Sequence, residues 1–196
     1  QLITLGPVGP IFTSGASFNA PENQTNIGVV YAIDGNGDAV TYTISGSELS
    51  ITTDGVLSFA SAPDFETKTT YSAVVTATDG QFSATQSIIV SVSNVNDVAP
   101  VFSSTATFSS DENQKSIGTV VASDIEDDSI IFSVSGSDVE ITTGGLLSFV
   151  DNPDYEIKSK YIATVSASDS VNIATQNITI NIININDNSP LFISGD

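Results

Sequence analysis

The chain has 196 residues, of which 23 are Asp or Glu and four are Lys, with no histidine, so its net charge is −19 at pH 7. This balance excludes a nucleic-acid partner, because phosphate binding requires basic side chains, and an anionic membrane surface would repel the chain. Cysteine is absent, which excludes disulfides, a thiol nucleophile and thiolate metal ligands. The composition therefore favours a folded, cation-binding protein.

The sequence contains two similar repeats, with a period of 90 residues. Pro10-Ile11-Phe12 returns as Pro100-Val101-Phe102, and about 40 positions are identical under this shift. A period of this length suits one small domain rather than a solenoid unit. We predict a lead-in at 1–9, repeats at 10–99 and 100–189, and the start of a following repeat at 190–196, where Leu191-Phe192 resembles the opening of a unit.

Apolar residues alternate with period two along most of each repeat, which is typical of half-buried strands. Strands are expected near Phe12 and Ile27, then at 40–44, Gly55–Phe59, 71–77 and 88–92, with equivalents in the second repeat. About seven short strands per repeat predict an all-β protein made of two tandem seven-stranded Greek-key, immunoglobulin-like β-sandwiches with antiparallel strands. No stretch approaches the roughly 20 apolar residues of a membrane span, so we predict no membrane insertion in this segment.

The acidic residues that recur lie at strand ends and in turns rather than within strands. Calcium prefers six to eight oxygen ligands, mixing carboxylates, carbonyls and water. In two sandwiches joined end to end, one group of acids would gather at the bottom of the first repeat and another at the top of the second, with Asn96 between them. These candidate ligands are Glu22, Asp64, Glu66 and Asp97 from the first repeat, and Asp124, Glu126, Asp128 and Asp169 from the second.

Two further acidic groups have simpler explanations. The segment Asp34–Asp38 imitates the start of an EF-hand loop but has no glycine at the sixth position and no glutamate at the twelfth. An ordinary turn is therefore the preferred interpretation, and a half-site for an upstream repeat is the alternative. The residues that match the first repeat's ligands form a half-site at the far end of the second repeat, expected to bind calcium weakly or only solvent: Glu112, Asp154, Glu156 and Asp187.

The order of these motifs resembles the cadherin repeat family, over nearly all of 10–190. The resemblance rests on the Glu-Asn pair near each repeat start, the Asp-x-Glu turns, the Ala-x-Asp strand ends and the Asn-x-Asn-Asp linker. It implies two to three calcium ions at the junction, with the Val95 and Val98 carbonyls, Asn96 and Asp97 supplied by the linker. Asn94 stands where such linkers usually begin with Asp, and the compact acidic turn at 124–128 looks more like bacterial-type repeats.

The resemblance implies a calcium-rigidified adhesion or spacer module, at the cell surface or outside the cell, with an anchor elsewhere in the parent protein. Its partner would be another adhesion protein, a second copy of itself, or a polysaccharide. A calcium-dependent carbohydrate-binding module is the alternative, weakened by the absence of tryptophan. An enzyme is not expected, because the paired acids Asp64 and Glu66 have no histidine or recognisable nucleophile beside them. The four lysines are expected to be solubilising surface charges.

Overall fold

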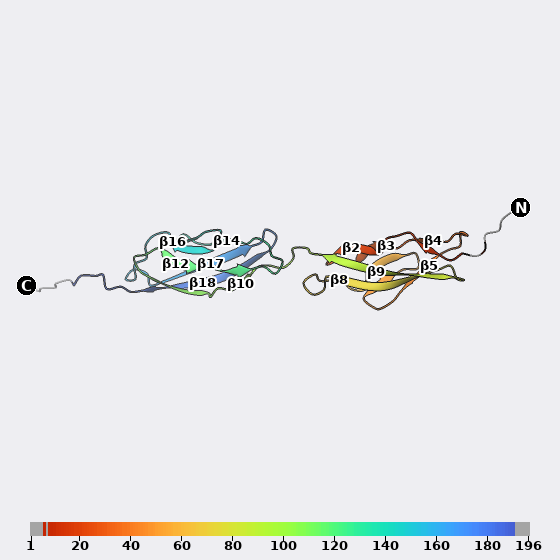
Figure 1. Ribbon diagram of the computed structural model, residues 1–196. Helices are drawn as coiled ribbons and strands as arrows, with labels where there is room; N and C mark the ends of the chain where they lie inside the picture. The colour runs from red at the N-terminus through yellow and green to blue at the C-terminus, as the bar shows by residue number, and fades with distance from the viewer. Residues whose placement is uncertain (1–5, 7, 191–196) are drawn as a thin grey trace, which may run out of the picture. The chain divides into compact units, whose positions relative to one another are not determined.

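The computed structural model describes residues 6 and 8–190, and the chain divides into two compact units, 1–95 and 96–196. Every regular element in the described residues is a β-strand, which confirms the predicted all-β class (Figure 1). The described residues include no helix that is long and apolar enough to cross a membrane. Most of the predicted lead-in and the predicted repeat start at Leu191-Phe192 lie outside the described residues.

The first unit contains nine strand segments rather than seven, because its first and second strands are each interrupted. Each interrupted strand contributes one segment to a short outer pair, β1 with β4, and one to a main sheet. The segments are β1 (Ile11–Phe12), β2 (Ser17–Pro21), β3 (Asn26–Val29), β4 (Ala32–Ile33), β5 (Thr41–Ile44), β6 (Leu49–Ile51), β7 (Val56–Phe59), β8 (Thr70–Thr78) and β9 (Ser83–Ser93).

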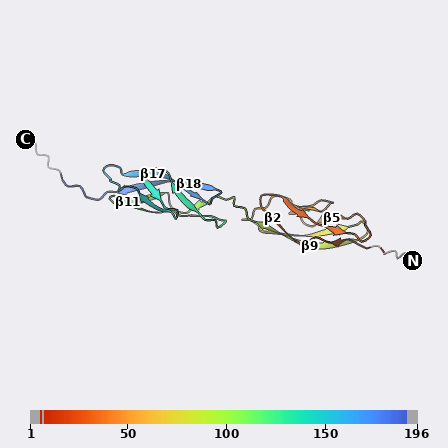
Figure 2. The same cartoon turned by 90° about the horizontal axis from the view of Figure 1, so that it is seen from above.

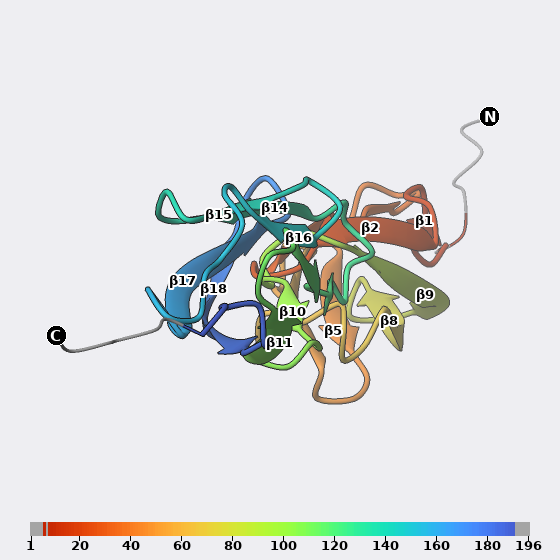
Figure 3. The same ribbon diagram turned by 90° about the vertical axis from the view of Figure 1, so that its left-hand side faces the viewer.

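The second unit repeats this order segment by segment. Its short outer pair is β10 with β13, and its longest strands, β17 and β18, lie side by side (Figure 3). The segments are β10 (Val101–Phe102), β11 (Thr107–Asp111), β12 (Ser116–Thr119), β13 (Ala122–Ser123), β14 (Ile131–Val134), β15 (Val139–Ile141), β16 (Leu146–Phe149), β17 (Lys160–Ser168) and β18 (Ile173–Ile183).

Each unit is a two-layer sandwich with its core between the layers. A four-stranded sheet, β2-β9-β8-β5, faces a three-stranded sheet, β3-β7-β6, and the second unit has the equivalent β11-β18-β17-β14 and β12-β16-β15. The predicted alternation is confirmed: along β8, Val75 and Ala77 are buried, and along β9, Ile88 and Val90 are fully buried. Leu57 of β7 closes the core from the opposite sheet.

The prediction of a wholly antiparallel sandwich is wrong for one strand pair in each unit. β2 runs parallel to β9, with Ser17 opposite Ile89 and Pro21 opposite Ser93 (Figure 2). The equivalent strand β11 runs parallel to β18. The first strand begins as β1, antiparallel to β4, and then crosses to the four-stranded sheet as β2. There it runs in the same direction as the last strand, β9. The chain therefore enters a unit at one end and leaves at the other.

One glycine in each unit is required by the backbone path. Gly55 has φ +90°, a conformation that side chains rarely adopt, and a Cβ there would overlap the Val30 carbonyl oxygen. Gly145 has the same φ, and its Cβ would overlap the Val120 carbonyl oxygen. Both glycines follow a turn that leads into the central strand of the three-stranded sheet, β7 or β16, so the turn can close only without a side chain.

Candidate metal centre

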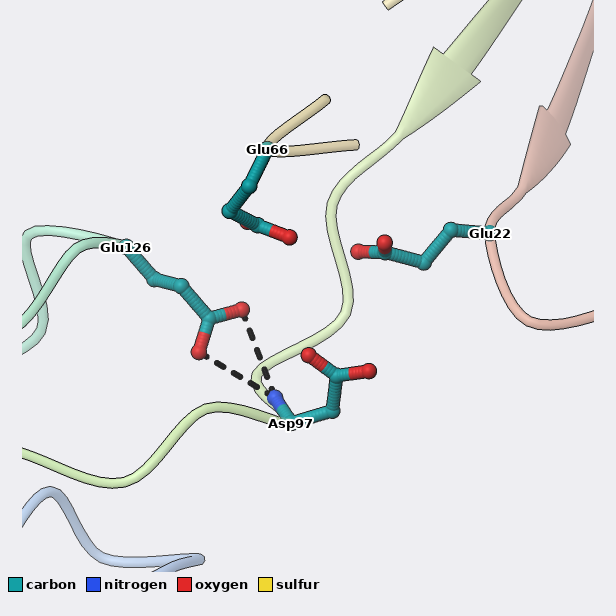
Figure 4. A group of neighbouring side chains, drawn as sticks. All are labelled: Glu22, Glu66, Asp97 and Glu126. Atoms are coloured by element: carbon teal, nitrogen blue, oxygen red, sulfur yellow. Dashed lines mark hydrogen bonds between the residues drawn. The ribbon is translucent and has the colours of Figure 1, made fainter. Parts of the chain in front are cut away.

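Glu22 lies at the end of β2 and organises the linker end of the first unit. Its side chain is buried, with 3% of the residue's surface exposed. One carboxylate oxygen accepts the N–H of Phe65 at 2.6 Å and the other accepts the N–H of Val95 at 2.8 Å. A single carboxylate therefore holds both the acidic turn and the start of the linker. A carboxylate oxygen of Glu22 and one of Glu66 lie within 4.8 Å of each other (Figure 4).

Replacing Glu22 with alanine is expected to lower the free energy of unfolding of the first unit by about 2–6 kcal/mol. Two backbone N–H groups would lose their acceptor, and each lost acceptor costs roughly 1–3 kcal/mol where water cannot replace it. Urea denaturation without calcium measures this loss. Glu22→Gln keeps one oxygen acceptor and should lose less. Equal loss in both variants would contradict the hydrogen-bonding role.

The two acids of the Asp-x-Glu turn make different contacts. Asp64 accepts the Thr67 N–H and the Thr67 hydroxyl, both at 3.0 Å, one on each carboxylate oxygen. In the second unit, Asp154 likewise accepts the Ile157 N–H at 3.0 Å. Neither aspartate places a carboxylate oxygen in the groups of acids that converge within 4.8 Å, whereas Glu66 and Glu156 do. Asp64 therefore stabilises its own turn, and its role as a calcium ligand stays a prediction.

Glu126 holds the linker against the second unit. Its carboxylate accepts the N–H of Asp97 at 3.1 Å and 3.3 Å, one from each oxygen (Figure 4), and the N–H of Val98 at 3.0 Å. The sequence predicted Glu126 only as a side-chain ligand. In the structure, its carboxylate also accepts hydrogen bonds from the backbone of the linker. Ligation through the Val95 and Val98 carbonyls stays a prediction.

Three acids of the turn that follows β13 converge as the sequence suggested. Asp124, Glu126 and Asp128 each offer a carboxylate oxygen within 4.8 Å of the others. Asp124 accepts the Glu126 N–H through Oδ1 at 2.9 Å, while its Oδ2 is buried without a hydrogen-bond partner. A buried carboxylate oxygen beside two other carboxylates is unfavourable unless a cation satisfies it. The donor set, all oxygens and mostly charged, is the one calcium prefers.

Asp169 and the linker residue Asn96 are joined by a residue that the sequence did not single out. The Asn172 side-chain amide donates to Asn96 Oδ1 at 2.6 Å and to Asp169 Oδ2 at 3.3 Å, and Asn96 donates to Asp128 at 2.8 Å. Burial alone would raise the pKa of Asp169, but N–H groups of Asn172 and Val171 and side-chain contacts with Asn172 and Asn96 hold it below its ordinary value. These contacts favour the ionised form of Asp169. Phe82 occupies the equivalent position in the first repeat, so the duplication does not mark Asn172.

The far end of the second unit repeats the Glu22 arrangement. Glu112 is buried and accepts the N–H of Tyr155 at 2.8 Å and of Ile185 at 2.7 Å. Glu112, Glu156 and Asp187 each offer a carboxylate oxygen within 4.8 Å of the others. The structure thus brings together three of the four residues of the predicted half-site, all within one unit.

The segment Asp34–Asp38 forms the turn that we preferred over an EF-hand loop. Asp34 accepts the N–H of Asn36 at 2.7 Å and of Asp38 at 3.2 Å through the same oxygen, Oδ1. Its Oδ2 is buried without a hydrogen-bond partner, as in the equivalent Asp124. Asp79, the equivalent of Asp169, has its pKa lowered by the N–H groups of Phe82 and Gln81. The turn has the same local form as the acidic turn of the second unit.

Comparisons with known proteins agree on one family, although no family model matches the chain. Human protocadherin Fat 4 is 35% identical over 181 residues, and Drosophila melanogaster cadherin-99C is 29% identical over 203 residues. These alignments cover 82% and 93% of this chain but only 4% and 12% of the relatives' own lengths. The chain therefore corresponds to a small part of each relative.

Solved structures give the same fold. Human protocadherin-24 EC1-2 matches with a TM-score of 0.79 at 21% identity, covering 92% of this chain and 100% of that chain. The protocadherin gammaB4 extracellular domain matches with a TM-score of 0.75 at 22% identity, covering 98% and 35%. The bacterial-type qualifier stays a prediction. By its fold, its duplicated motifs and these relatives, the chain belongs to the cadherin repeat family.

Proposed function

We propose that this segment is a calcium-rigidified spacer and adhesion module, in which calcium binds at the linker and draws ligands from both repeats. The first repeat and linker would supply Glu22, Asp64, Glu66, the Val95 carbonyl and Asp97. The second would supply Asn96, the Val98 carbonyl, Asp124, Glu126, Asp128 and Asp169. Two to three ions would satisfy a donor set of this size, because each calcium takes six to eight oxygens.

The observation that best supports this proposal is the buried, unpartnered Oδ2 of Asp124 within the group that includes Glu126 and Asp128. An acidic turn that served only solubility would leave its carboxylates in water. Here the backbone instead gathers three of them within one ligand sphere, where unneutralised charges repel. Glu126 also binds the linker N–H groups, so an ion held by this turn would act directly on the linker.

Calcium would fix the relative orientation of the two repeats. Without it, carboxylates crowded around a short linker repel one another, and the two repeats are free to change their relative orientation. With it, one ion shared by ligands from both repeats removes that freedom. Extracellular modules bind calcium at roughly 10⁻⁴–10⁻³ M, so millimolar calcium outside cells would fill the sites. Adhesion to another protein or to a second copy, and the polysaccharide alternative, stay predictions.

Calcium addition is expected to raise the radius of gyration measured by small-angle X-ray scattering and to raise the unfolding temperature. The first result reports an extended, stiff pair of repeats, and the second follows from binding to the folded state alone. Magnesium at the same concentration is the control, because it accepts only near-ideal octahedral geometry and retains its waters. Scattering and melting curves that do not differ between calcium and chelator would refute the proposal. A polysaccharide pull-down with and without chelator tests the alternative.

A further inference from the structure

Two of the four lysines occupy the same position in both repeats, immediately after the acidic turn. Lys68 follows Asp64-Phe65-Glu66-Thr67, and Lys158 follows the equivalent four residues. The other two lysines are not repeated, since Lys115 and Lys160 stand opposite threonines in the first repeat. The chain has 23 acidic residues and only four lysines, and one lysine is retained at the same position in both repeats. This retention suggests that the lysine does more than increase solubility.

In the first unit, Lys68 connects the acidic turn to two other elements. Its backbone N–H donates to the Asp64 carbonyl at 2.9 Å, which closes the turn. Its ammonium group forms an ion pair with Glu48, just before β6, and lies 4.4 Å from the centre of the Tyr71 ring. Tyr71 in turn packs edge-on against the buried Phe59, with ring centres 5.0 Å apart. The turn is thereby fastened to the core.

The second unit repeats these contacts with a changed partner. Lys158 forms an ion pair with Asp138 at 2.7 Å and lies 4.2 Å from the centre of the Tyr161 ring. Tyr161 packs edge-on against Phe149 at 4.9 Å. Glutamate in one repeat is replaced by aspartate in the other, yet the ion pair is kept. The charge and the aromatic platform are therefore the retained features.

We infer that Lys68 and Lys158 are positioning residues, which hold the Asp-x-Glu turn in the orientation that calcium needs. This inference rests on the proposed calcium function. Glu66 lies two residues before Lys68 and has an oxygen within 4.8 Å of one from Glu22, so repulsion in the calcium-free state pushes the turn outward. The ion pair and the cation–π contact oppose that movement. Calcium then binds to a turn that already has the required orientation.

The sign of the effect distinguishes positioning from simple charge. A lysine near a cation site weakens calcium binding by repulsion, so its removal should strengthen binding if only charge matters. If Lys68 positions the turn, Lys68→Met should instead weaken calcium affinity by about two- to five-fold, the range expected for a partly exposed pair. Lys115→Met changes the net charge by the same amount and is the matched control. Lys68→Arg keeps both contacts and should restore the wild-type affinity.

The test is isothermal titration of the whole chain with calcium, combined with amide hydrogen exchange in chelator. Lys68→Met should bind more weakly than Lys115→Met, and its Thr67 and Lys68 amides should exchange faster, while those of β8 and β9 are unchanged. Calcium affinity in Lys68→Met equal to or tighter than in Lys115→Met would overturn the positioning role. If the wild-type chain binds no calcium, the proposed function fails, and unchanged exchange at Thr67 would separately show that Lys68 does not hold the turn.

Discussion

Asp97→Ala is expected to weaken calcium binding at the linker about tenfold or more. The second unit supplies the reason: Asp187, which stands 90 residues after Asp97, places an oxygen within 4.8 Å of oxygens from Glu112 and Glu156. The repeat therefore predicts that Asp97 completes the matching group with Glu22 and Glu66. Its loss removes one negative charge from the ligand set, and ligand charge strongly tunes calcium affinity.

Calcium titration of the melting transition measures this effect. At a calcium concentration 100 times Kd, one site stabilises the folded state by about 2.7 kcal/mol, and a tenfold weaker site by only about 1.4 kcal/mol. Asp187→Ala is the matched control, since it removes an equivalent aspartate from the far end of the second unit. It should leave binding at the linker unchanged. Equal losses in the two variants would mean that calcium acts on overall charge rather than at the linker.

Gly55→Ala is expected to unfold the first unit or to destabilise it by about 3 kcal/mol or more. The left-handed conformation costs a non-glycine residue roughly 1–2 kcal/mol, and overlap with the Val30 carbonyl oxygen adds a further 1–3 kcal/mol of packing strain. Thermal denaturation followed by circular dichroism should show an early transition for this unit, with the transition of the second unit retained.

Gly46→Ala is the control for backbone conformation alone. Gly46 has φ +83°, but an added Cβ would meet nothing within 4 Å, so only the conformational cost of about 1–2 kcal/mol is expected. Gly145→Ala should reverse the pattern and destabilise the second unit, because its Cβ would overlap the Val120 carbonyl oxygen. A Gly55→Ala chain as stable as Gly46→Ala would show that the turn relaxes without cost.

Alternation and duplication predicted most of the fold. Val75, Ala77, Ile88 and Val90 are buried because period-two patterning determines which face of a strand meets the core. The parallel pairing of β2 with β9 was missed, since alternation is identical in parallel and antiparallel ladders and carries no strand direction. The interruption between β1 and β2 was also missed. Gly15 lies there in the first repeat but threonine in the second, so no single residue type marks the break.

The sequence predicted several of the acids that lie close together in the structure, but not the backbone hydrogen bonds that they accept. Glu22 and Glu112 were expected only as ligands, yet each also binds two backbone N–H groups far away in sequence. Asp64 was expected only as a ligand, yet both of its oxygens also accept hydrogen bonds within its own turn. These differences depend on which donors the folded backbone brings within reach. A motif records residue types and spacing, and long-range donors appear in neither.

The parallel β2–β9 pair has a mechanical consequence. A chain that enters a unit at one end and leaves at the other transmits tension through its first and last strands. In a parallel pair, pulling these strands in opposite directions loads all five paired positions, Ser17 to Pro21, together in shear. An antiparallel first strand would instead peel away one hydrogen bond at a time. Because forced unfolding is governed by the unfolding rate, each unit is expected to resist stretching far better than its modest size suggests.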